Sequence, residues 1–222
     1  MVAIGTGTGQ SARSYPPGFA IDGPFGYSLA MQFPKGFTAL IMTSDAPLDD
    51  AWTAVLPRSI ATASESRISE WIGGRIAVQR AFAKAAVRVG ADAFKNGSFR
   101  KIESNPNWSF SISHTSEWAF AWVTNDKVSI GVDIEDSDRE IKPAVAARFA
   151  HGNDLALAPI LLWSAKEAAF KSVPVESQID LVVSKIAIGD GTFTISDRDI
   201  NGFWRQEIAG DLVRSFAWTE SK

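Results

Sequence analysis

Two carboxylates stand two positions apart near the end of a predicted strand. Residues 128–135 read Val-Ser-Ile-Gly-Val-Asp-Ile-Glu, and their alternating apolar residues are typical of a strand with one buried face. The same alternation places Asp133 and Glu135 together on the other face. Two carboxylates so placed repel one another unless a cation binds, and oxygen ligands suit a hard ion such as Mg²⁺. The pair therefore predicts a metal site; the alternative is an exposed strand end with two solvated acids.

A second candidate pair lies on a predicted helix further along the chain. Residues 163–171 read Trp-Ser-Ala-Lys-Glu-Ala-Ala-Phe-Lys, contain neither Gly nor Pro, and are rich in residues that favour a helix. Glu167 and Lys171 are four residues apart, so their side chains meet on one helix face. Taken alone, they describe an ordinary surface pair that stabilises a helix by roughly a few tenths of a kcal/mol.

A third candidate set is basic and precedes the other two. Apolar residues at helical spacing predict a helix over residues 64–89, ended by Gly90, although the adjacent Gly73 and Gly74 argue against a single straight helix. The helix carries Arg67, Arg75, Arg80, Lys84 and Arg88; Arg67 and Arg75 can point the same way, because eight residues are a little over two turns. The alternative is a solvated basic face.

The rest of the sequence predicts a lead-in segment, a polar loop, two further helices and several strands. Residues 1–27 are rich in Gly, Pro and Ser and predict a loosely structured lead-in, whereas residues 95–108 predict a polar loop. Asn153 is the expected cap of a helix that runs to residue 173, with Pro159 breaking or kinking it. We also expect a short helix at residues 141–149 and strands at residues 37–43, 109–112, 118–123, 181–188, 192–195, 203–208 and 213–219.

The composition is that of an ordinary globular protein, with 222 residues of which 45% are hydrophobic and 21% charged. The net charge of −3 argues against a general surface for nucleic acid or anionic membranes. The chain has no cysteine for a disulfide, a thiolate zinc site or a nucleophile, and only two histidines. Residues 1–10 lack the pattern of a secretory signal, and no apolar run of about 18 residues predicts a membrane span. We therefore expect a cytoplasmic protein.

Three segments, in this order, resemble the signature motifs of the 4′-phosphopantetheinyl transferases. They are residues 110–115 (Phe-Ser-Ile-Ser-His-Thr), residues 131–135 (Gly-Val-Asp-Ile-Glu) and residues 163–171. The spacing of Arg67 and Arg75 is also similar to that family's Arg-x₇-Arg helix, which grips the phosphates of coenzyme A. The length of the chain and the form of the motifs resemble the longer class that serves siderophore and other nonribosomal peptide synthesis, which implies a monomer.

The resemblance implies a reaction. The 4′-phosphopantetheine arm of coenzyme A would pass to a serine of an apo acyl or peptidyl carrier protein, releasing adenosine 3′,5′-bisphosphate. Mg²⁺ would be held by Asp133, Glu135 and Glu167 and would offset the charge of the diphosphate. Glu167 would also act as the base for the serine, directly or through a metal-bound water. Lys171 would neutralise the departing diphosphate.

The resemblance also implies which residues bind coenzyme A. Arg67 and Arg75 would grip phosphate groups, for which the planar guanidinium fork is suited. Ser113 and His114 would hold the 3′-phosphate, and Lys171 would contact the diphosphate. Taken alone, His114 is better explained by a core histidine that is hydrogen-bonded to the backbone, and the motif context reverses this preference.

The implied fold is α+β. Two similar α+β halves would be related by a pseudo-two-fold, with the active site at their interface. The N-terminal half, residues 1–110, would carry the phosphate-binding helix. The C-terminal half, residues 111–222, would carry the metal and acid/base motifs.

One loop departs from the family pattern. Where the family has a Gly-x-Pro loop that contacts the coenzyme, this chain has Asn105 and Pro106 without the glycine, and Arg100 and Lys101 are candidates to replace its contacts. This departure motivates an alternative, a non-catalytic member that binds coenzyme A or a carrier protein. A different Mg²⁺-dependent phosphotransfer enzyme is disfavoured because the sequence has no Gly-rich phosphate loop of the Walker type.

Overall fold

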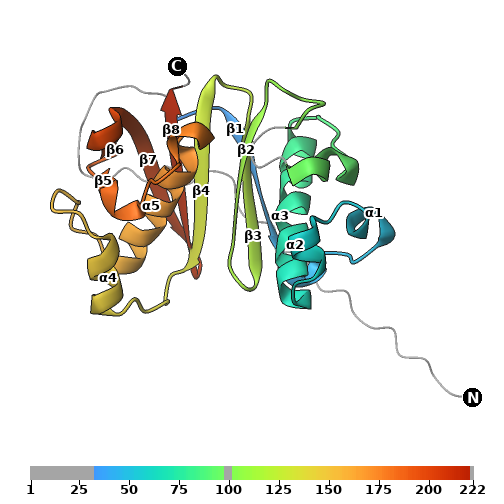
Figure 1. The fold of residues 1–222 in the computed structure, drawn as a ribbon, viewed down its shortest axis with the longest axis horizontal. Helices are drawn as coiled ribbons and strands as arrows, with labels where there is room; N and C mark the ends of the chain where they lie inside the picture. Colours follow the sequence, from blue (N-terminus) through green and yellow to red (C-terminus); the bar gives the residue numbers. More distant parts are fainter. Residues whose placement is uncertain (1–32, 98–101, 221–222) are drawn as a thin grey trace, which may run out of the picture. The chain divides into compact units, whose positions relative to one another are not determined.

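Two antiparallel sheets, each covered by one long helix, make up the described part of the chain (Figure 1). The structure is a computed structural model, and it describes residues 33–97 and 102–220. The mixture of helices and sheets confirms the predicted α+β class. Within these residues no helix is both long and apolar enough to cross a bilayer. The predicted lead-in at residues 1–27 lies outside the described residues, as do Arg100 and Lys101.

The first sheet has three strands in the order β1-β3-β2, and both pairings are antiparallel. Its strands are β1 (Gly36–Met42), β2 (Ser109–His114) and β3 (Trp118–Thr124). The sequence predicts all three: the apolar residues of β2 alternate, whereas β1 and β3 contain short continuous apolar runs. The predicted division of the chain at residue 110 runs through β2, and the first sheet extends to Thr124.

The long helix α3 (Glu65–Lys84) covers this sheet. Ser64 is its N-cap, and the Ser64 hydroxyl accepts a hydrogen bond from the Arg67 N–H. The predicted continuation to residue 89 is wrong. Ala86 adopts a left-handed backbone with a φ of 57°, and this conformation cannot continue a right-handed helix.

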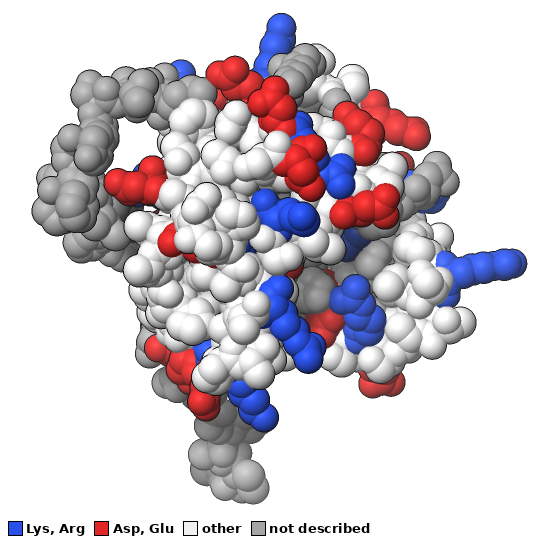
Figure 2. Space-filling view, turned by 60° about the vertical axis from the view of Figure 1, so that its left-hand side comes forward, with Lys and Arg blue, Asp and Glu red and all other residues white. Residues whose placement is uncertain are grey.

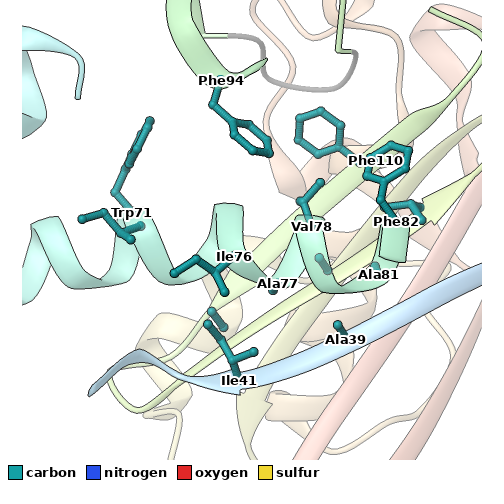
Figure 3. Packing of buried hydrophobic residues seen from close by; sticks show 14 of the residues in the cluster. Ala39, Ile41, Trp71, Ile76, Ala77, Val78, Ala81, Phe82, Phe94 and Phe110 are labelled. Atoms are coloured by element: carbon teal, nitrogen blue, oxygen red, sulfur yellow. The ribbon is translucent and has the colours of Figure 1, made fainter. Parts of the chain in front are cut away.

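Two adjacent glycines let α3 lie close to the sheet. The helix is continuous through Gly73 and Gly74. A Cβ atom at Gly74 would lie 2.7 Å from Cγ2 of Ile112, and one at Gly73 would lie 3.4 Å from Cβ of Ala119. Figure 3 shows the resulting core, in which side chains of α3 face β1 and aromatic rings gather at one end. Its buried members include Ala39, Ile41, Trp71, Ile76, Ala77, Val78, Ala81, Phe82, Phe94 and Phe110.

Short helices fill the connections. α1 (Asp50–Thr53) and α2 (Arg58–Ala61) precede α3 in a region without a clear sequence pattern. The Asp49 carboxylate caps α1 by accepting the Trp52 N–H at 3.0 Å. In the second half of the chain, α4 (Pro143–Phe149) confirms the predicted short helix, and its proline stands at the start.

The second sheet has five strands in the order β4-β8-β7-β6-β5, all antiparallel. Most of the predicted strand at residues 181–188 does not pair, because Val183–Lys185 turn as a short 3-10 helix. Gly191 takes a φ of 65° in the hairpin turn between β5 and β6. The strands are β4 (Val128–Asp136), β5 (Ala187–Ile188), β6 (Thr192–Ile195), β7 (Ile200–Ala209) and β8 (Leu212–Glu220).

Helix α5 (Pro159–Ser172) covers the second sheet and starts later than predicted. The expected cap, Asn153, lies in a turn, and Ala158 is the residue that precedes the helix. Pro159 occupies the first helical position, where the N–H that proline lacks would have no partner within the helix. Pro159 therefore begins the helix instead of breaking it.

The two sheets meet where β2 runs beside β4, near the middle of Figure 1. The Ser111 hydroxyl on β2 accepts a hydrogen bond from the Val132 N–H on β4 at 3.0 Å. Phe216 of β8 packs edge-on against Phe120 and Trp122 of β3, with ring centroids 5.7 and 5.6 Å apart. Aromatic packing and a side-chain hydrogen bond thus join the first sheet to the second.

Strand β4 is buried on both faces, which corrects the expectation of a single buried face. Asp133 is only 3% exposed, although it lies on the face expected to be solvated. Helix α5 covers that face: a Cβ atom on Gly131 would lie 2.0 Å from the carbonyl oxygen of Ala168. Only a residue without a side chain lets the strand and the helix backbone come so close.

Replacing Gly131 by alanine should therefore destabilise the protein. The added methyl group meets backbone atoms of α5 that cannot move aside, and overpacking of this kind costs about 1–3 kcal/mol or more. Urea unfolding followed by tryptophan fluorescence measures the change. Gly152→Ala is the matched control, because a Cβ atom there meets nothing within 4 Å. Equal stability of the two variants would contradict the close contact between β4 and α5.

Candidate functional site

A pocket of about 300 Å³ opens where β2, β4 and α5 meet. It carries charged side chains of both signs, and Lys and Arg are likewise mixed with Asp and Glu on the face drawn in Figure 2. Six of the eight predicted site residues line this pocket, and the other two, Arg67 and Arg75, lie on α3. The lining residues are Ile112, Ser113, His114, Asp133, Glu135, Arg139, Trp163, Glu167 and Lys171.

Asp133 is the most buried charged group of the pocket. Its Oδ1 accepts hydrogen bonds from the Ser113 hydroxyl and from the Lys171 ammonium, both at 2.8 Å. Lys171 Nζ also donates to the Ser113 oxygen at 3.0 Å. The second carboxylate oxygen, Oδ2, is buried without a hydrogen-bond partner among the described residues. A buried carboxylate oxygen without a partner is costly, so this atom is poised to bind a ligand.

Glu135 is held by two residues that the metal hypothesis did not include. Its Oε1 accepts from the Trp163 indole N–H at 2.8 Å, and its Oε2 forms an ion pair with the Arg139 guanidinium. Burial raises the pKa of Glu135, the hydrogen bond from Arg139 opposes this rise, and the Asp133 carboxylate adds to it. The sequence offers one signal for Arg139, which is its position four residues after Glu135 in the charged turn.

Glu167 shares the pocket with the other two acids. Lys171 forms its ion pair with Asp133 and not with Glu167, the partner that helical spacing predicts. Burial raises the pKa of Glu167; the Lys171 ammonium opposes this rise, and the carboxylates of Asp133 and Glu135 add to it. The three carboxylates therefore repel one another across a shared space.

The donor set fits a cation in its chemistry. Within residues 33–97 and 102–220, no three His, Asp or Glu side chains converge closely enough to form a ready-made metal site. However, the partnerless Oδ2 of Asp133 and the raised pKa values of Glu135 and Glu167 are both relieved by a positive ion. All-oxygen ligands suit Mg²⁺. An ion at Glu135 would compete with the Arg139 guanidinium for the same carboxylate.

His114 stands at the other end of the pocket and contacts α3. Its Nε2 is 3.1 Å from Arg67 Nη1, and its Nδ1 is 3.7 Å from Glu70 Oε2. Burial lowers the pKa of His114, Glu70 opposes this shift, and positive groups led by Arg67 reinforce it. The side chain is 31% exposed and bonded to a side chain, so the alternative of a backbone-bonded core histidine is wrong. Sequence reasoning did not identify Glu70.

Arg75 is half-buried and does not belong to a solvated basic face. Its guanidinium lies 4.1 Å from the centre of the Trp71 ring, and its Nη1 donates to the Trp71 carbonyl at 3.3 Å. Burial lowers the pKa of Arg75 to about 10, and the charge of Arg67 contributes. The two arginines therefore act on the same region, as their spacing predicts.

Lys166, although it stands within the third motif, faces the core and not the pocket. Its Nζ is fully buried, pairs with Asp154 at 2.9 Å and donates to the Ile186 carbonyl. Asp154 also accepts the N–H groups of His151 and Ile188. Burial lowers the pKa of Lys166, and Asp154 opposes this shift. Lys166 thus anchors α5 to the preceding turn and to β5.

Comparison of this chain with protein-family models and with curated proteins yields no match.

Acidity of the pocket makes stability depend on pH. Because Glu135 and Glu167 have higher pKa values when folded, the folded protein holds more protons than the unfolded chain above about pH 4.5, the ordinary pKa of Glu. These groups therefore lower the free energy of unfolding as the pH rises through that window. In Glu167→Gln this fall should be shallower. Urea unfolding with a chelator present, from about pH 4.5 to 7, measures both slopes. A variant slope as steep as that of the wild type would contradict the shift at Glu167.

Proposed function

We propose that the protein transfers 4′-phosphopantetheine from coenzyme A to a serine of an apo carrier protein, in an Mg²⁺-dependent reaction that releases adenosine 3′,5′-bisphosphate. The observation that carries this proposal is the meeting of three distant motifs in one pocket. His114 comes from β2, Asp133 and Glu135 from β4, and Glu167 and Lys171 from α5. Their chemistry is that required by a phosphoryl transfer.

The three acids would hold the metal. Asp133, Glu135 and Glu167 are the candidate ligands, and the partnerless Asp133 Oδ2 supports this role. When bound, Mg²⁺ supplies positive charge that stabilises the diphosphate. Arg139 lines the pocket. If the metal displaced it from Glu135, its guanidinium could bind phosphate oxygens there.

Proton transfer is assigned to α5. The serine oxygen forms a bond to the phosphorus that carries the pantetheine arm, and the bond from that phosphorus to the oxygen of the leaving bisphosphate breaks. Glu167, which lines the pocket beside Lys171, accepts the serine proton directly or through a water. Lys171, whose ammonium lies between Asp133 and Ser113, stabilises the charge that builds on the leaving oxygen.

The 3′-phosphate of coenzyme A is assigned to His114 and Arg67, with Arg75 adding positive charge behind them. His114 lines the pocket, Arg67 contacts its imidazole, and the charges of both arginines act on it. The Ser113 hydroxyl is bonded to Asp133 and Lys171, so its contact with the coenzyme stays a prediction.

The strand order supports the pseudo-two-fold of the proposal. In the first sheet the first strand β1 pairs with the last strand β3, which pairs with β2. In the second sheet the first strand β4 likewise pairs with the last strand β8, which pairs with β7. A covering helix follows the first strand in each case. The pocket would then lie at the interface of two related halves, in a cytoplasmic monomer that serves siderophore or other nonribosomal peptide synthesis.

A transfer assay tests the proposal. The protein is incubated with Mg²⁺, coenzyme A and a panel of apo carrier proteins, and the mass of each carrier is measured. A gain of one phosphopantetheine on serine is expected. Coenzyme A binding without any gain across the panel favours the alternative, a non-catalytic member that binds coenzyme A or a carrier protein.

Asp133→Asn should abolish transfer while the protein stays folded. The amide keeps an acceptor for Ser113 and Lys171 but removes the negative charge that a cation requires. Asp138→Asn, on the exposed turn after β4, is the matched control and should transfer normally. Turnover of Asp133→Asn near the wild-type rate at ordinary Mg²⁺ would reject the metal site.

His114→Ala should impair the use of coenzyme A far more than the use of dephospho-coenzyme A. The imidazole would contact only the 3′-phosphate, and a hydrogen bond to a charged group contributes about 1.5–3 kcal/mol. Comparison of kcat/KM for the two donors measures the difference. His151→Ala, which removes a histidine outside the pocket, should affect both donors equally. Equal losses in His114→Ala would return His114 to a structural role.

A further inference from the structure

An acidic side chain lies where the proposed function requires a phosphate. Glu70 stands on α3 three residues after Arg67, and its side chain is 18% exposed. Its Oε2 is 3.0 Å from Arg67 Nη1 and 3.7 Å from His114 Nδ1. Both groups assigned to the 3′-phosphate of coenzyme A therefore face a carboxylate of their own chain.

We propose that Glu70 is an internal counter-ion, which occupies the anion subsite of the free protein and which an incoming phosphate monoester must displace. The inference rests on the proposed function for the identity of that phosphate. Glu70 lowers the affinity for the phosphate and, in the same way, excludes singly charged anions from the subsite.

The hydrogen bonds define the charge of the subsite. An arginine N–H can only donate, so the 3.1 Å contact between Arg67 Nη1 and His114 Nε2 requires that Nε2 accept. His114 is then neutral and carries its proton on Nδ1, on the side of Glu70. Among these three residues one guanidinium and one carboxylate remain charged, and their charges cancel.

Exchange of Glu70 for a ligand favours a doubly charged group. A phosphate monoester carries about 1.5–2 negative charges near neutral pH, so it attracts Arg67 more strongly than a carboxylate does. It also offers two oxygens to the guanidinium fork. A carboxylate such as acetate carries the same single negative charge as Glu70, so exchanging Glu70 for acetate gains no attraction to Arg67. Ser66 provides a place for the displaced side chain, because Glu70 Oε1 already lies 3.4 Å from the Ser66 hydroxyl.

A positioning role for Glu70 predicts the opposite sign. If Glu70 oriented Arg67 and His114 towards the phosphate, its removal would weaken binding. The 3.7 Å between Glu70 Oε2 and His114 Nδ1 is longer than a hydrogen bond, so Glu70 does not fix the imidazole. Glu70 does bond Arg67 at 3.0 Å, so the sign of the change in affinity separates the two roles.

Binding calorimetry on the full chain tests the proposal. The ligands are adenosine 3′,5′-bisphosphate and adenosine 5′-monophosphate, which lacks the 3′-phosphate. Glu70→Gln and Glu70→Ala should bind the bisphosphate about two- to fivefold more tightly than the wild type, the range that a partly exposed ion pair carries. Both variants should bind the monophosphate as the wild type does. Glu65→Gln changes an exposed acid in the first turn of the same helix and should alter neither affinity.

Acetate competition adds a second measurement. At constant ionic strength, acetate should weaken bisphosphate binding by the two Glu70 variants and leave binding by the wild type unchanged. Urea unfolding shows whether the two variants are folded. If the wild type prefers the bisphosphate and both folded variants bind it no more tightly than the wild type, the counter-ion role is overturned. If the proposed function is wrong, the wild type will bind the two nucleotides equally. That result would also reject the counter-ion role.

Discussion

The approach of α5 to β4 at Gly131 is the constraint on which the pocket depends. The Ala168 carbonyl oxygen would lie 2.0 Å from a side chain at that position, so the helix backbone rests directly on the strand. From there Lys171 reaches the Asp133 carboxylate at 2.8 Å, and Glu167 enters the same pocket one turn earlier. The spacing of the charged groups is therefore set by a residue that contributes no chemistry.

Internal pairing of charges is the second organising feature. Asp133 is paired with Lys171, Glu135 with Arg139, and Arg67 with Glu70. Charges that are partly buried need such partners, because removing them from water is costly. Binding of a charged ligand is then an exchange of partners, so the net affinity is much smaller than the attraction between ligand and site. The arrangement favours ligands that satisfy both signs of charge at once, as a metal–diphosphate complex does.

Features set by neighbouring residues could be predicted from the sequence, whereas features set by residues distant in the chain could not. Short apolar runs, some of them alternating, identified most of the strands, because they reflect contacts within one strand and its sheet. Six of the eight predicted site residues line one pocket, and Arg67 and Arg75 do not. The start of α5 at Pro159, the burial of Lys166 and the partner of Lys171 were predicted wrongly or not at all. The start at Pro159 follows a local rule that the sequence reasoning did not apply. The other two depend on residues elsewhere in the chain: Lys166 pairs with Asp154 and donates to the Ile186 carbonyl, and Lys171 pairs with Asp133. Local spacing carries no information about such partners.

The hydroxyl side chains along β2 have a consequence for the edge of the second sheet that faces the first sheet. β4 is the terminal strand of its sheet, and main-chain groups at such an edge are a template for pairing with another chain. Here Ser111 takes up the Val132 N–H, and Ser113 bonds to the neighbouring Asp133 side chain. The Ser111 hydroxyl therefore does for the Val132 N–H what a strand carbonyl would do, and it leaves one main-chain group fewer at that edge for pairing with a second molecule. A residue next to the pocket thus also satisfies the backbone of the neighbouring sheet.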